Sequence, residues 1–237
     1  MKKAFVLLTA IILSGSIFAQ INDEKILDSL VRDKSINEQF EIVSKEVSKY
    51  NSENLLRRLF YSRALLDIAL QSENASLIGR ANYDLAYSYE IIGQSDLGIE
   101  ACFEALKYLE EANDSYLIGM TYNEIGLIYS ASSNMNELYK AIEYFNKFLE
   151  TQIERNDTAE IAGAYSNIGF IYIKMQNADS AFFYSKKALD LRMKIKQERT
   201  IPISLGNVGI SFFYLGQLDS ARVYYDKAID IYKESNN

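Results

Sequence analysis

Apolar residues recur at helical spacing along most of the chain, and the same pattern returns about every 40 residues. Four stretches align with one another, and each carries a small residue inside an apolar run. These small residues are Ala86, Gly126, Gly169 and Gly209, with spacings of 40, 43 and 40. A period of this length predicts supersecondary units that bury their apolar faces by stacking on their neighbours.

Each unit is predicted to be two helices. In the first, Ile168, Gly169 and Tyr172 share one face, and the other units carry equivalents. Glycine inside a helix costs about 1 kcal/mol relative to alanine, so its recurrence predicts a close approach of two helices. The second helix follows a turn that contains an aspartate, and we expect its carboxylate to cap the helix. These aspartates are Asp96, Asp179 and Asp219.

The stretch before the four units has a weaker pattern. Residues 36–50 and 53–70 are predicted to form one amphipathic helix pair, a degenerate first repeat, after a short helix over 23–31. Residues 20–76 are therefore assigned to N-terminal helices and this first repeat. The chain as a whole is predicted to be all-α.

The repeated residues resemble the tetratricopeptide repeat family in its long form of about 40 residues, as in kinesin light chains and bacterial signalling regulators. Tyr165, Ile168-Gly169, Tyr172, Ala181 and Ala188 match the family pattern. One unit departs from the pattern, with Gly98 and Cys102 at positions where the family has alanine and an aromatic residue. We interpret Cys102 as a buried core residue. The resemblance implies a right-handed α-solenoid of antiparallel helix pairs, with four repeats at 77–116, 117–159, 160–199 and 200–237.

The first nineteen residues have the features of a signal peptide. Lys2 and Lys3 precede an apolar run over 4–13, and Ala19 offers a small residue for cleavage before Gln20. We expect an exported protein, periplasmic or extracellular. An uncleaved N-terminal anchor is the alternative.

Composition excludes several functions. The chain has no His and one Cys, which removes Ser–His and Cys–His catalysis, His-ligated metal sites and intrachain disulfides. Without residues 1–19 it carries 23 basic and 32 acidic side chains, a net charge of −9. Nucleic acid is therefore not an expected partner, and neither is a membrane beyond a possible N-terminal anchor. We expect no catalytic residues, cofactor or metal.

Stacked helix pairs form a superhelix whose first helices line a concave surface. The resemblance implies that a peptide or protein binds there, and the apolar character of this face favours an apolar or amphipathic ligand. The candidate residues are Arg80, Tyr83, Tyr87, Asn123, Leu127, Phe170, Lys174, Ile210 and Tyr214. Alternatively, these side chains pack internally. The 18 tyrosines admit the same two interpretations, packing or a binding surface, and carbohydrate stacking is a further option.

Two functions agree with these features. The first is a free exported scaffold that binds a peptide or partner protein without catalysis. The second is the extracytoplasmic sensory region of a signal-transduction protein, which the resemblance to repeat-containing sensor kinases implies. The last predicted helix ends close to Asn237 with no capping helix after it. This favours the second function, in a chain cut from a longer one, whereas the absence of a further membrane-length apolar run favours the first.

Overall fold

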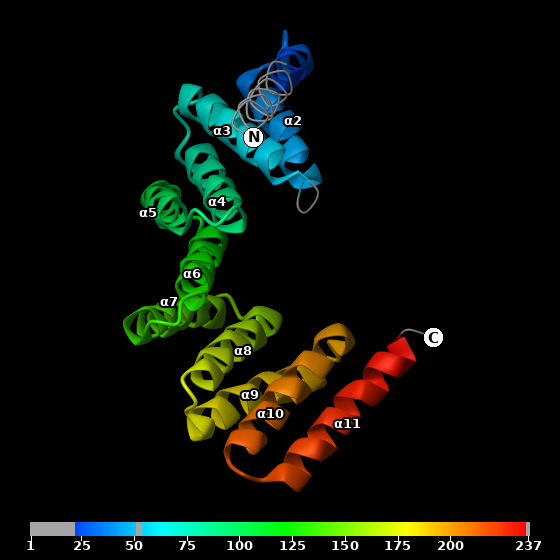
Figure 1. Ribbon diagram of the computed structural model, residues 1–237. Helices are drawn as coiled ribbons and strands as arrows, with labels where there is room; N and C mark the ends of the chain where they lie inside the picture. The colour runs from blue at the N-terminus through cyan, green and yellow to red at the C-terminus, as the bar shows by residue number, and fades with distance from the viewer. Residues whose placement is uncertain (1–21, 51–53, 236–237) are drawn as a thin grey trace, which may run out of the picture.

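The computed structural model describes residues 22–50 and 54–235, which form a solenoid of antiparallel α-helices (Figure 1). The helices follow one another along a curved array, and both ends of the array lie on the same side in the view of Figure 1. The predicted all-α solenoid is thereby confirmed. The predicted signal peptide, 1–19, lies outside the described residues. No helix within the described ranges combines the length and apolar character needed to cross a membrane.

The helices alternate as members of pairs. Residues 22–31 are helical and precede the pair α2 and α3. The next four pairs each contain a first helix, α4, α6, α8 or α10, and a second helix, α5, α7, α9 or α11. The helices are α2 (Ile36–Lys49), α3 (Leu55–Gln71), α4 (Ala75–Ile91), α5 (Ser95–Ala112), α6 (Ser115–Ser130), α7 (Met135–Glu154), α8 (Thr158–Lys174), α9 (Ala178–Lys194), the 3₁₀ turn η1 (Glu198–Thr200), α10 (Ile201–Tyr214) and α11 (Leu218–Ser235).

The predicted aspartate caps of the second helices are wrong, and in α5 and α9 the aspartate lies two residues after the cap. Asp96, Asp179 and Asp219 lie within the first turns of α5, α9 and α11. The cap of α9 is Asn177, whose Oδ1 accepts from the backbone N–H of Ser180 at 3.1 Å. In the first turn an aspartate stabilises the helix through the dipole, because its charge lies near unpaired N–H groups.

The two helices of each pair approach closely at the predicted small residues. A Cβ added to Gly169 would lie 2.8 Å from Ser185 Oγ and 3.1 Å from the backbone N of Ser185. At Gly126 and Gly209 the added atom would meet the rings of Phe145 and Tyr225 at 2.6 and 2.9 Å. The predicted close approach is therefore present, and in each pair it involves the same position of the second helix. In the pair α4 and α5 that position is Cys102, which is buried as predicted.

Beside these contacts, aromatic rings from both helices pack together, with a lysine over them. Tyr129 stacks on Tyr144 with ring centroids 6.0 Å apart, and Tyr172 stacks on Tyr184 at 5.5 Å. Lys147 Nζ lies 4.5 Å from the Tyr144 centroid, and Lys187 Nζ lies 4.9 Å from that of Tyr165. Each such cation–π contact contributes about 0.5–1 kcal/mol at a partly exposed site. Many of the tyrosines therefore pack between helices.

We expect Gly169→Leu to lower the free energy of unfolding by about 3 kcal/mol, because the backbone of Ser185 cannot move away without separating α8 from α9. Gly206→Leu is the matched control, since an added Cβ there meets no atom within 4 Å. That variant should be neutral or slightly stabilising. Urea denaturation followed by circular dichroism measures both. Equal stability of the two variants would contradict the close-approach interpretation.

Candidate ligand-binding surface

The first helices of successive pairs lie beside one another on the inside of the curve. Residues of α4 contact α6, and residues of α8 contact α10. In Figure 1, α5 and α7 lie on the outside of the same curve. The inner face is therefore the face on which the sequence predicts a binding surface.

Three polar candidates are bonded within the protein. Arg80 of α4 donates to Ser44 Oγ of α2 at 3.1 Å, and its guanidinium lies 5.5 Å from the Phe40 ring centroid. Lys174 at the end of α8 donates to the carbonyl oxygens of Ser130 and Ser132, the second at 2.8 Å. These side chains connect neighbouring first helices and thereby fix the distance between those helices on the inner face.

Asn123 forms the third of these links. Its Oδ1 accepts a hydrogen bond of 2.9 Å from Asn167 Nδ2, which joins α6 to α8. Both residues are half-buried. This amide–amide bond joins α6 to α8 directly.

The apolar candidates are more accessible. Leu127 of α6, Phe170 of α8 and Tyr214 of α10 are 38%, 48% and 43% exposed. Ile210 is half-buried one turn before Tyr214. An exposed residue of this kind on three consecutive first helices gives the C-terminal half of the inner face an apolar character.

The N-terminal half is more polar and more buried. Tyr83 and Tyr87 of α4 are half-buried. The guanidinium of Arg58 lies 4.7 Å from the Tyr87 ring centroid, and its Nη1 donates to Val47 O at 3.0 Å. Arg58 is only 4% exposed. It comes from α3, and sequence reasoning did not single it out.

Glu124 of α6 is the most unusual group in this half. Its side chain is 3% exposed, and its Oε1 has no hydrogen-bond partner among the residues that the structure describes. Burial raises the pKa of Glu124 from 4.5 to about 7; the charge of Glu90 adds to the rise and that of Arg58 opposes it. Burial also raises the pKa of Asp84, the equivalent residue of α4, and here Arg58 and Arg80 oppose the rise.

Sequence reasoning missed Glu124, although the repeat register contains a signal for it. Asp84, Glu124, Asn167 and Asn207 occupy the same position of the four first helices. All four first helices carry a carboxylate or an amide at this position, which predicts a polar environment for it. Periodicity alone does not show that the glutamate is buried.

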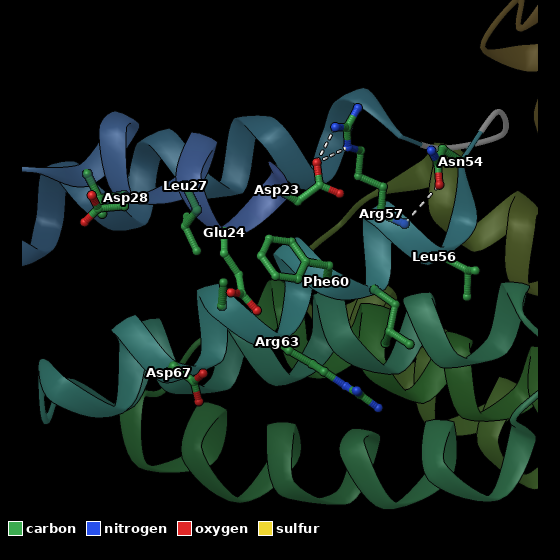
Figure 2. A pocket seen from close by; sticks show the side chains of 13 residues that line it. Asp23, Glu24, Leu27, Asp28, Asn54, Leu56, Arg57, Phe60, Arg63 and Asp67 are labelled. Atoms are coloured by element: carbon green, nitrogen blue, oxygen red, sulfur yellow. Dashed lines mark hydrogen bonds and ion pairs between the residues drawn. The ribbon is translucent and has the colours of Figure 1, made fainter. Parts of the chain in front are cut away.

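A hollow of about 740 Å³ lies elsewhere, between helix 22–31 and α3. Figure 2 shows its side chains: Asp23 is paired with Arg57, Phe60 and Leu56 supply apolar surface, and Arg63 extends along α3. It does not include any of the predicted groove residues. Within the described ranges, no cluster of His, Cys, Asp and Glu could hold a metal ion.

Residues 160–234 match the model of the tetratricopeptide repeat. The matched segment resembles this family, and the helix pairs of the described residues have the fold of tetratricopeptide-like arrays. A sequence search of curated proteins finds no significant match.

Solved structures have the same fold. BtubC (BKLC) from P. vanneervenii is 20% identical, with a TM-score of 0.75 over 95% of this chain and 92% of that one. A putative kinesin light chain from Podospora anserina, with nearly identical TPR-like repeats, is 12% identical, with a TM-score of 0.67 over 85% and 96%. NprR in complex with its cognate peptide NprX is 20% identical, with a TM-score of 0.53 over 99% and 75%.

We expect the stability of the wild-type protein to fall, relative to Glu124→Gln, as the pH rises from 5 to 8. Because the pKa of Glu124 is about 7 when folded and 4.5 when unfolded, the folded state binds the extra proton between these values and loses about 3 kcal/mol across them. Glutamine does not ionise and escapes this loss. Glu90 and Tyr83 on α4, Arg58 on α3 and Cys102 on α5 interact electrostatically with this carboxyl group and are unchanged in the comparison.

Urea denaturation at pH 5, 6, 7 and 8 measures this difference. Glu100→Gln, on an exposed position of α5, is the control for removing one acidic group. If the stability difference between Glu124→Gln and the wild type stays constant over this range, the buried carboxyl group does not titrate as the structure indicates.

Proposed function

We propose that the protein is a non-catalytic interaction scaffold that binds an apolar or amphipathic peptide segment on its inner face. The observation that carries this proposal is the exposure of Leu127, Phe170 and Tyr214 on three consecutive first helices. Exposed apolar surface on a concave face gives a helix or extended segment a place to bury its own apolar side. The repeated hydrogen bonds between first helices support the proposal, because they hold this surface in one shape before a ligand arrives.

The complex of NprR with its cognate peptide NprX supports the ligand class, since a protein of similar fold binds a peptide. The polar side chains Arg80, Asn123 and Lys174 are already bonded inside this protein. Recognition therefore depends on apolar contact more than on grips to a peptide backbone or a terminal carboxylate.

We also propose export, from the basic and apolar pattern of residues 2–13. The expected mature protein begins at Gln20. N-terminal sequencing and intact mass of the protein from the envelope fraction of expressing cells measure this directly. An intact N-terminal Met1 on protein in the membrane fraction would favour the anchor instead.

The second candidate, a sensory region of a signalling protein, is favoured by the outer side of α11. Leu106, Leu149 and Leu189 are 7%, 9% and 3% exposed and pack on the first helix of the next pair. Their equivalent on α11, Ile229, is 48% exposed. Such a face fits a further unit that docks on α11. In this case the bound ligand transmits its signal by changing the contact between α11 and that unit.

We expect Phe170→Glu to abolish ligand binding without unfolding the protein. The ring is 48% exposed, so a charge there costs little stability but removes apolar contact and opposes an apolar ligand. The measurement is affinity capture from envelope extract, followed by titration calorimetry with the captured polypeptide.

Phe183→Glu is the matched control, because Phe183 is 51% exposed but lies on the second helix α9. It should bind as the wild type does. A polypeptide captured equally by all three proteins places the binding surface elsewhere. Loss of binding only in Ile229→Asp, run in parallel, favours the second candidate. Unfolding of Phe170→Glu would make Phe170 a core residue and remove the basis of the proposal.

A further inference from the structure

We call the interface between two successive first helices a seam. Equivalent residue pairs lie in successive seams. Asn123 of α6 and Asn167 of α8 form one pair, and they share a hydrogen bond of 2.9 Å. In the repeat register the same pair between α4 and α6 is Tyr83 and Glu124. These two seams differ in whether their polar side chains find hydrogen-bond partners within the chain.

The seam between α8 and α10 is completed in another way. Arg192 reaches from α9, and its Nη1 donates to Ser204 Oγ at 2.6 Å and to Ser166 Oγ at 3.4 Å. A cationic donor thus occupies this seam from within the protein. Both of these seams therefore contain hydrogen bonds between side chains of the chain itself.

The seam between α4 and α6 differs from both. Glu124 is only 3% exposed, yet its Oε1 accepts no hydrogen bond from any residue that the structure describes. Arg58, whose charge acts on Glu124, donates to Ser88 Oγ at 3.1 Å and to Val47 O at 3.0 Å. A buried carboxylate without a donor is costly, and a cationic N–H donor is the partner that removes this cost most fully.

We propose that the carboxylate of Glu124, in the seam between α4 and α6, binds a lysine or arginine side chain of the peptide held on the inner face. The proposal rests on the proposed function and adds a charge requirement to it. The acidic balance of the chain, −7 at pH 7, favours the approach of such a ligand. Tyr83, half-buried against the same seam, offers a ring on which the aliphatic part of the basic side chain packs.

The peptide then has a defined polarity. Its basic side chain lies at α4 and α6, and its apolar side chains extend over Leu127, Phe170 and Tyr214 toward the C-terminal end. A basic residue at one end of an apolar segment is therefore the pattern that this surface selects.

The test is selection from a random twelve-residue peptide library, with purified wild-type protein and Glu124→Gln in parallel. Glu160→Gln is the matched control, because Glu160 is a half-buried glutamate on another first helix, α8. We expect the wild type and Glu160→Gln to enrich apolar residues together with lysine or arginine at one fixed position. Glu124→Gln should enrich the apolar residues alone.

A synthetic peptide from the wild-type selection provides the quantitative arm. We expect it to bind Glu124→Gln roughly tenfold or more weakly than the wild type, and a version with norleucine at the basic position to bind both proteins equally. If acetylation of the peptide N-terminus causes the loss and norleucine does not, the group bound is the terminal amine and the assignment to a side chain is overturned.

The remaining outcomes separate this inference from the proposed function. Apolar enrichment without a basic residue in the wild type, or with the same basic residue in Glu124→Gln, overturns the role of Glu124 and leaves the scaffold proposal intact. No enrichment with any of the three proteins contradicts the binding surface itself, and the inference falls with it. Denaturation curves of all three proteins at the selection pH establish that each is folded.

Discussion

The close approach of the two helices in each pair is the constraint on which the rest of the array depends. Gly126, Gly169 and Gly209 leave room for Phe145, Ser185 and Tyr225 of the facing helix. Successive pairs stack directly on one another. A small rotation from each pair to the next gives such an array its curve.

The curve in turn brings the first helices together on the inside, where polar side chains connect them. Asn123 and Asn167, Lys174 and the carbonyl groups after α6, and Arg80 with α2 form bonds between different pairs. Aromatic rings with lysines over them occupy the interfaces between α6 and α7 and between α8 and α9. Apolar packing therefore sets the spacing inside each pair, and polar links set the arrangement between pairs, which shapes the inner face.

Sequence patterning predicted the first of these levels well and the second poorly. The small residues mark the close approach because glycine inside a helix has a cost that only packing repays. The aspartates after the turns were assigned as caps from residue type alone. The structure instead has Asn177 as the cap of α9 and Asp179 inside its first turn, since the turn ends two residues earlier. Helix boundaries depend on turn geometry that the apolar period does not encode.

The inner face was predicted only in part for the same reason. Leu127, Phe170 and Tyr214 are exposed on it because first helices present one face to the interior of the curve. Arg80, Asn123 and Lys174 were predicted as residues of a ligand-binding surface, yet each is bonded to a neighbouring part of the array. Contacts between repeats depend on the angle between them, and a single repeat's pattern contains no information on that angle.

The angle between repeats also determines which partner the neighbouring repeat offers to Glu124. The same position holds Asn167 in the next repeat, where an amide both donates and accepts and the chain supplies the partner. A carboxylate only accepts, and its Oε1 has no hydrogen-bond partner in the described part of the chain, although the residue opposite it in the register is a tyrosine. Proteins seldom retain a buried charge that has no partner, because its desolvation lowers stability at every pH at which it is ionised. The retention of this one on the face that carries the exposed apolar row is the physical reason to assign it to recognition and not to folding.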